Sequence, residues 1–205
     1  MRTKYKQWAV DYVDEHPEIA LQKFVIEDKF FQEKPLIFEI GSGKGDFIAA
    51  ISLEHPEYNY LAIEKVKTVA GIMCKKLVEQ GNENVKVFPW SVELIFDSVK
   101  EGFAHSIYLN FSDPWPKKKH EKRRLTYVAF LNEYYRILRK GGRLYFKTDN
   151  DDLYLYTREE IKLTKFKVIS DEENYNFDSE TDYITEYENK FRSVGKSIHR
   201  IILEK

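Results

Sequence analysis

The sequence predicts an α/β fold whose central sheet is doubly wound and mostly parallel. Short apolar runs rich in β-branched and aromatic residues alternate along the chain with amphipathic stretches of about ten to fifteen residues. This alternation is typical of strands joined by crossover helices, which cover both faces of a parallel sheet. A glycine-rich turn follows the first regular apolar run. In such a sheet, ligands bind at the carboxyl ends of the strands.

Each element is expected from its apolar pattern and from the residues that bound it. The predicted strands are residues 36–40, 58–63, 85–90, 107–111, 144–147, 166–169 and 198–203. The predicted helices are residues 5–13, 46–53, 68–80, 92–99, 125–139 and 153–163. Gly81 is expected to end the third of these helices, and Gly141 with Gly142 to give the fifth a left-handed C-cap.

The length of 205 residues indicates one domain, residues 1–205, with a substantial core. We expect residues 1–34 to form an N-terminal helical extension. Residues 171–197 are polar and aromatic without clear periodicity, and we interpret them as an ordered insertion that binds substrate. The sequence leaves both a monomer and a homodimer open.

The composition excludes several classes of protein. A hydrophobic content of 42% is too high for a disordered chain, and no apolar run is long enough to span a bilayer. The N-terminus lacks the apolar stretch of a secretory signal. Cys74 is the only cysteine, and the five histidines show no ligand spacing. We therefore predict a cytoplasmic protein without a membrane segment or a metal.

The net charge of −1 argues against a uniformly basic surface that would bind any polyanion. Charge is instead segregated, because residues 117–124 contain six Lys or Arg while residues 178–188 are acidic. Such segregation can steer a polyanion toward one face, although a charge run is more often a solvated surface. The position of the basic run in the chain therefore decides its interpretation.

That basic run directly follows the most informative stretch of the sequence. Residues 107–111 alternate like a buried strand, and Asp113-Pro114-Trp115-Pro116 ends it, because proline cannot donate to a ladder. An acid and a flat aromatic are thus placed at a strand end beside cations. We interpret this stretch as a site for a nucleic-acid base beside its phosphates, with Trp115 either stacking on the base or anchoring the core. The predicted phosphate contacts are Lys118, Lys119, Lys122, Arg123 and Arg124.

The first strand leads into Glu-Ile-Gly-Ser-Gly-Lys-Gly at residues 39–45. A Walker loop needs Ser or Thr after its lysine, but Lys44 precedes Gly45. The dinucleotide fingerprint needs Gly or Ala where this chain has Asp46. S-adenosylmethionine, which has no phosphates, remains as the ligand. Glu64 supports this choice, because an acid that ends the second strand can accept hydrogen bonds from both ribose hydroxyls.

Together these residues resemble the Rossmann-like class I methyltransferases, and more narrowly the bacterial tRNA (guanine-N7)-methyltransferases. The resemblance runs from about residue 36 to the C-terminus, and its motifs are residues 39–45, 108–118, 121–126, 146–150 and 185–188. It implies a seven-stranded, mostly parallel sheet with an antiparallel C-terminal strand. It also implies S-adenosylmethionine as cofactor, tRNA as partner, and methylation of N7 of guanine 46 in the variable loop.

The resemblance also implies roles for individual residues. The expected cofactor contacts are Glu39, Gly41, Gly43, Gly45, Glu64, Ser91 and Asp113. The expected substrate contacts are Lys117, Asp149, Thr185, Glu186, Tyr187 and Glu188. The family usually has an acid at the position of Ser91, where it can accept from the adenine amino group. In this chain Ser91 follows Trp90, and a serine can still accept while the indole can stack.

Asp113 is the predicted catalytic residue. Guanine N7 carries a lone pair and no proton, so its methylation needs no general base. The carboxylate would stabilise the positive charge of the product purine, or it would grip the guanine N1–H and amino group, a role that Asp149 can also fill. Three alternatives stay open: another RNA or exocyclic-amino methyltransferase of the same fold, disfavoured because Trp115 replaces a second proline; a non-catalytic tRNA-binding subunit; and, least favoured, a nicotinamide oxidoreductase.

Overall fold

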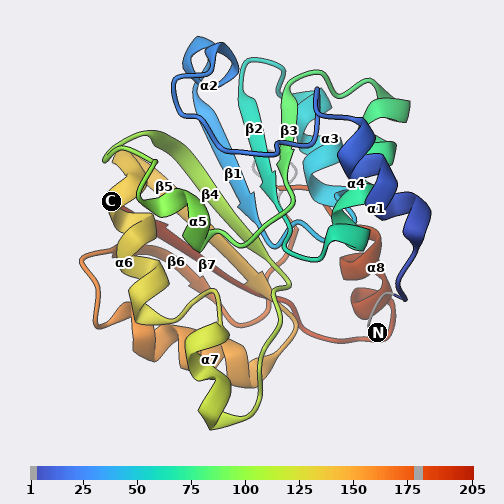
Figure 1. The fold of residues 1–205 in the computed structure, drawn as a ribbon. Helices are drawn as coiled ribbons and strands as arrows, with labels where there is room; N and C mark the ends of the chain where they lie inside the picture. Colours follow the sequence, from blue (N-terminus) through green and yellow to red (C-terminus); the bar gives the residue numbers. More distant parts are fainter. Residues whose placement is uncertain (1–3, 178–181) are drawn as a thin grey trace. The chain divides into compact units, whose positions relative to one another are not determined.

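The computed structural model describes residues 4–177 and 182–205. Its strands are β1 (Leu36–Ile40), β2 (Asn59–Ile63), β3 (Val85–Phe88), β4 (Ala104–Asn110), β5 (Leu138–Thr148), β6 (Lys167–Glu172) and β7 (His199–Glu204). Within the described residues they are ordered β3-β2-β1-β4-β5-β7-β6 in a seven-stranded sheet (Figure 1). The pairs β1–β2, β2–β3 and β4–β5 are parallel, and β7 runs antiparallel to β5 and β6. The predicted fold class is confirmed.

The chain divides into two compact units, Met1–Val99 and Lys100–Lys205. The expectation of a single domain over residues 1–205 therefore stays a prediction. The first unit has helices α1 (Gln7–Glu15), α2 (Lys29–Glu33), α3 (Asp46–Glu54), α4 (Lys67–Gln80) and α5 (Glu93–Phe96). The second has the 3-10 helix η1 (Lys118–Arg123) and helices α6 (Val128–Ile137), α7 (Asp151–Ile161) and α8 (Glu186–Ser193).

In the first unit the strands are buried along their whole length. Every residue of β1 and β2 is buried, which explains why both read as continuous runs rather than as an alternation. The N-terminal extension belongs to this unit, because α1 lies against α4 (Figure 1). Gly71 permits this close packing, since a Cβ at that position would lie 1.7 Å from the backbone oxygen of Ala9.

In the second unit β5 begins directly after α6, at Leu138, and the predicted glycine C-cap after residue 139 is wrong. Gly141 and Gly142 lie inside β5, where Gly141 donates its N–H to Lys205 and Gly142 accepts from the same residue. The strand is therefore extended by pairing with the C-terminal segment. The helical periodicity of residues 125–139 followed by two glycines predicted a helix end, and it could not reveal the distant pairing with Lys205.

The predicted insertion at residues 171–197 contains the end of β6 and the helix α8, which was not predicted. Residues 178–181 of this segment lie outside the described residues. The helix begins with Thr-x-x-Glu, the sequence of a capping box, and Thr185 Oγ accepts from the N–H of Glu188 at 3.1 Å. That spacing was the available sign of a helix start.

No helix in the described ranges is both long and apolar enough to cross a membrane. The same residues contain no group of three or more His, Cys, Asp or Glu side chains arranged to hold a metal ion.

Candidate active site

The glycine turn of the first unit fixes one carboxylate at the end of β2. Gly43 donates its N–H to Glu64 Oε2 at 3.1 Å, and Val66 donates to Glu64 Oε1 at 2.8 Å. The turn is itself tied to the same strand end, because Gly41 and Ser42 both donate their N–H groups to the carbonyl of Ile63. A carboxylate has about four acceptor sites, and these two N–H groups occupy one on each oxygen of Glu64.

The glycines of the turn have different structural roles. Gly41, Gly43 and Gly45 have φ values of 80°, 56° and 79°, a region that disfavours a Cβ. Gly45 is also required for packing, since a Cβ there would lie 2.5 Å from Met73 Cγ. A Cβ at Gly43 would meet nothing within 4 Å, so the backbone there is open to a ligand. An open backbone beside a fixed carboxylate fits S-adenosylmethionine.

Glu39, the other acid predicted at the cofactor, lies in β1 one residue before its end and is 2% exposed. Ser42 Oγ donates to its carbonyl at 2.8 Å, which ties the strand end to the turn. The structure thus brings Glu39, the glycines and Glu64 together at neighbouring strand ends, since β1 and β2 pair in parallel.

Beyond β3, Ser91 donates its hydroxyl to the carboxylate of Glu93. Trp90 precedes it and is 40% exposed, while Glu93 is exposed at the start of α5. An acid is therefore present two residues beyond the position where the family usually has one. The sequence prediction missed Glu93, although the Ser-x-Glu spacing before a helix was the available signal.

In the second unit, Asp113 is exposed on a loop that leaves β4 under backbone strain. Phe111 and Trp115, on either side of it, have φ values of 51° and 41°. Non-glycine residues rarely adopt this region, and such strain clusters at functional sites. Phe111 donates its N–H to the carbonyl of Lys147 at 2.8 Å, which anchors the loop to β5.

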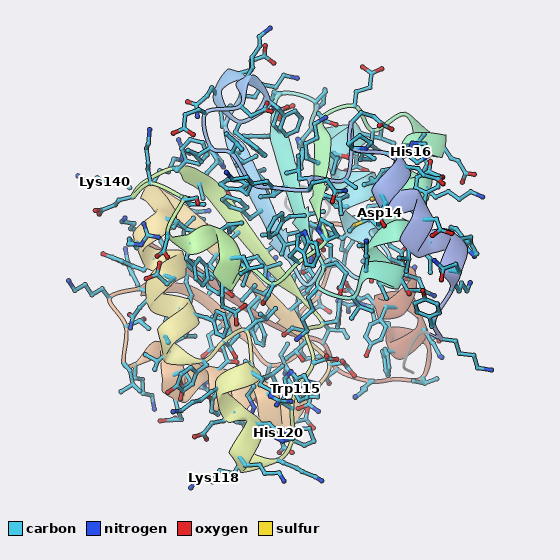
Figure 2. All side chains as sticks on the ribbon, in the orientation of Figure 1. Asp14, His16, Trp115, Lys118, His120 and Lys140 are labelled. Atoms are coloured by element: carbon cyan, nitrogen blue, oxygen red, sulfur yellow. The ribbon has the colours of Figure 1, made fainter. Side chains whose placement is uncertain are left out.

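The basic run after this loop forms η1, and most of its cations are exposed. These exposed residues are Lys117, Lys118, Lys119, Lys122 and Arg123. Figure 2 shows Trp115 beside His120, with Lys118 extending outward from the same end of the ribbon. The guanidinium carbon of Arg123 lies 5.1 Å from the centre of the partly buried Trp115 ring.

Arg124 is placed differently from the other cations of the run. It is partly buried, and its guanidinium donates to the carbonyls of Pro114 at 2.9 Å and Trp115 at 3.1 Å. Its donors face the loop that carries Asp113. This geometry does not favour the phosphate contact predicted for Arg124.

Asp149 and Tyr187 lie together in the second unit. The Tyr187 hydroxyl donates to Asp149 Oδ1 at 3.5 Å, and Lys196 Nζ lies 2.5 Å from Asp149 Oδ2. The Tyr187 ring is 5.0 Å from the ring of Phe111, which joins this pair to the strained loop. Burial and the charges of Asp149 and Asp113 raise the pKa of Tyr187 to about 12, so its hydroxyl stays a donor at neutral pH.

The remaining residues of the 185–188 motif have structural contacts. Thr185 caps α8 and Glu188 is fully buried, where its carboxylate pairs with Lys147 at 2.8 Å and Arg192 at 2.7 Å. The side chain of Glu186 lies outside the described part of the structure. A direct substrate contact by Thr185 or Glu188 stays a prediction that their burial does not favour.

Lys147 was not predicted from the sequence, yet it is the centre of this buried cluster. Its Nζ lies 2.7 Å from Asp182 Oδ1 and 2.8 Å from Glu188 Oε2, and its side chain is 3% exposed. Burial raises the pKa of Asp182, while the ammonium of Lys147 opposes the shift. The sequence signs of the cluster were a charged residue in an apolar strand and the presence of Lys147 and Glu188 in two of the quoted motifs.

Several solved structures with a similar fold are methyltransferases. An antibiotic-related methyltransferase matches with a TM-score of 0.62 at 15% identity, covering 100% of this chain and 97% of that chain. The 16S rRNA methyltransferase KamB matches with a TM-score of 0.64 at 10% identity, covering 89% and 94%. A SAM-dependent methyltransferase from Aquifex aeolicus matches with a TM-score of 0.58 at 14% identity, covering 98% of both chains. The fold is that of the S-adenosylmethionine-dependent methyltransferases.

Sequence relatives narrow this class to one family. A family model described as "Putative methyltransferase" matches residues 33–201. Proteins named tRNA (guanine-N(7)-)-methyltransferase match from Staphylococcus saprophyticus, at 38% identity over 98% of both chains, and from Bacillus subtilis, at 38% over 100% of this chain and 99% of the relative. The relative from Lactobacillus delbrueckii subsp. bulgaricus is 40% identical over 97% and 96%. The chain belongs to the tRNA (guanine-N7)-methyltransferase family, and S-adenosylmethionine is its cofactor.

Proposed function

We propose that this enzyme methylates N7 of guanine 46 in the variable loop of tRNA. The observation that carries the proposal is the grouping of Asp149, Tyr187 and Phe111 with the strained loop that bears Asp113. Carboxylates can accept from the N1–H and amino group of a guanine, and the aromatic rings offer it apolar surfaces. We further propose that the enzyme acts in the cytoplasm as a monomer or a homodimer.

The first unit would hold the cofactor, which when bound supplies a methyl group on a cationic sulfur. Glu64, fixed by the N–H groups of Gly43 and Val66, would accept hydrogen bonds from the ribose hydroxyls. Ser91 and Glu93 would accept from the adenine amino group, and the open backbone at Gly43 would allow close approach. These contacts are hydrogen-bond acceptors and an unobstructed backbone, which suit a ligand that has hydroxyl and amino donors and no phosphates.

The second unit would position the guanine and stabilise its charge. N7 has a lone pair and no proton, so the chain need not supply a general base. A carboxylate close to the ring would stabilise the cationic product, and this role falls to Asp113 because its side chain is exposed. Asp149, held by Tyr187 and Lys196, would grip the Watson–Crick edge of the base.

The exposed cations of η1, together with Lys117, would bind tRNA phosphates. Such contacts read shape rather than sequence, which suits a structured RNA. Extruding the base from the tRNA core would cost a few kcal/mol, which stacking on Trp115 would partly offset.

The experiment that tests the proposal is incubation with labelled S-adenosylmethionine and an unmodified tRNA transcript, followed by nucleoside analysis. We expect 7-methylguanosine as the product, and borohydride with aniline should then cleave the strand at position 46. A transcript with adenine at position 46 is the matched control and should take up no label. If the product is instead a guanine methylated on its exocyclic amine, the strand stays uncut, and the proposed N7 methylation is wrong.

A further inference from the structure

The loop that carries Asp113 has two strained positions within five residues. Phe111 has φ 51° and Trp115 has φ 41°, although both have bulky side chains and Trp115 lies between two prolines. A left-handed conformation at such residues persists only where the surroundings hold it. At the Phe111 end, the hydrogen bond from the N–H of Phe111 to the carbonyl of Lys147 supplies that support.

At the Trp115 end, the support comes from the guanidinium of Arg124. Its Nε donates to the carbonyl of Pro114 at 2.9 Å and its Nη2 to the carbonyl of Trp115 at 3.1 Å. One planar fork therefore holds two consecutive carbonyls, and these are the first two after Asp113. The rigid spacing of guanidinium donors suits this arrangement, which a lysine ammonium cannot reproduce.

Helix α7 holds Arg124 in place. The guanidinium carbon of Arg124 lies 4.0 Å from the ring centre of Tyr156 on this helix. Residues that follow Arg124 in the chain are hydrogen-bonded to the same helix. Thr157 Oγ1 donates to Thr126 Oγ1 at 2.8 Å, and Glu160 accepts the N–H of Val128 at 2.6 Å. Helix α7 begins two residues after Asp149. The same helix therefore supports the loop that carries Asp113 and lies next to Asp149 in the chain.

We propose that Arg124 is a positioning residue, which fixes the Asp113 carboxylate through the loop backbone rather than binding a tRNA phosphate. This inference rests on the proposed function. Arg124 differs from Lys122 and Arg123 in being partly buried and in donating to two backbone carbonyls of the loop. Its contribution therefore belongs to the rate of methyl transfer and not to tRNA affinity.

The test compares Arg124→Lys with the wild type, because lysine keeps the charge and loses the fork. We expect kcat at saturating tRNA and cofactor to fall by about 100-fold, the loss typical of a misplaced catalytic group. The tRNA Kd and its salt dependence should stay within about twofold of wild type. Arg158→Lys is the matched control, since Arg158 lies on α7, its guanidinium likewise contacts a tyrosine ring, and it takes no part in the site. It should retain the wild-type kcat.

Arg123→Ala gives the signature of a phosphate contact for comparison, namely weaker tRNA binding with a flatter salt dependence. If Arg124→Ala shows this signature while its kcat at saturating tRNA is preserved, the inference is overturned. A wild-type kcat in Arg124→Lys overturns it as well. Addition of guanidinium to Arg124→Ala should restore part of kcat, which general destabilisation would not produce.

A further variant covers the case in which changes at Arg124 prevent folding. Tyr156→Leu keeps Arg124 and its charge but removes the ring beneath the guanidinium, and it should lower kcat with tRNA affinity unchanged. Unchanged kcat in Tyr156→Leu counts against the inference. The product made by the wild type separates the two proposals. If the wild type forms no 7-methylguanosine, the proposed function is wrong. If it forms 7-methylguanosine and Arg124→Lys keeps the wild-type kcat, only the proposed role of Arg124 is wrong.

Discussion

Lys147 and Glu188 form an ion pair of 2.8 Å in which the two side chains are 3% and 0% exposed. The pair joins β5 to α8, and Asp182 and Arg192 complete its charge balance. The motif at residues 185–188 was predicted to contact the substrate. Two of its residues, Thr185 and Glu188, instead make contacts within the protein that fix the position of the motif. Tyr187, which lies between them in the sequence, is left 45% exposed beside Asp149.

Replacing Glu188 with alanine should destabilise the protein by about 3–5 kcal/mol, because it leaves a buried lysine with one partner fewer. Urea unfolding, analysed for both the midpoint and the slope, measures the change. Glu133→Ala is the matched control: it breaks a half-exposed pair with Arg136 at the surface, and should cost about 1 kcal/mol or less. Equal losses in the two variants would contradict a structural role for Glu188.

The glycine turn should respond differently at its two later positions. Gly45→Ala should cost about 2–5 kcal/mol of stability, from left-handed strain added to the clash with Met73. Gly43→Ala should cost only about 1–2 kcal/mol, because its surroundings are open. We expect the same variant to weaken S-adenosylmethionine binding by about tenfold or more, since the new methyl occupies the open face. Calorimetric titration of both variants checks this, and cofactor affinity unchanged in Gly43→Ala would remove that residue from the site.

Glu93 should contribute to recognition of adenine. Glu93→Gln removes a charged acceptor from Ser91, and we expect the affinity for S-adenosylhomocysteine to fall by about tenfold. S-inosylhomocysteine lacks the amino group, so its affinity should not change. Glu57→Gln alters an exposed acid elsewhere in the first unit and serves as the control. Parallel losses for both ligands would show that Glu93 does not contact the amino group.

Asp113→Ala should lower kcat by about 100- to 1,000-fold, the range seen when a group that stabilises transition-state charge is removed, while tRNA binding stays nearly intact. Single-turnover rates and filter binding measure the two quantities. Near-normal turnover would exclude Asp113 from the mechanism. A tRNA with inosine at the target position, which lacks the amino group, separates charge stabilisation from gripping: if Asp149 grips the base, Asp149→Asn and inosine should not be additive.

Neutralising Lys118, Lys119 and Arg123 together should flatten the salt dependence of tRNA binding. Each phosphate contact contributes about 0.7–0.9 to the slope of log affinity against log salt, so the triple change to glutamine should reduce it by about 2–3. Lys140→Gln with Lys162→Gln changes exposed lysines outside η1 and should leave the slope nearly unchanged. Equal slopes for the triple variant and the wild type would refute the phosphate assignment.

The sequence predicted most of the fold because buried parallel strands are continuous apolar runs bounded by breakers. Residues 36–40 were predicted with the observed bounds of β1, and α4 differs from its prediction by one residue at its start. The C-terminal helix α8 and the true start of β5 were missed. In both cases long-range contacts decided the structure, through the ion pairs of Lys147 and the pairing of Gly141 and Gly142 with Lys205.

The sequence alone also determined that the predicted site residues lie near strand ends, since Asp113, Glu64 and the glycines closely follow predicted strands. Only the tertiary structure decided which charged groups are available to a ligand. Lys147 and Asp182 are 35 residues apart in the chain, and no local pattern shows that they neutralise one another. The same holds for Arg124, which reads as one more cation in a basic run until its carbonyl partners and Tyr156 are known. Periodicity reports burial of apolar surface, whereas the direction of a charged side chain depends on partners that folding brings from distant positions.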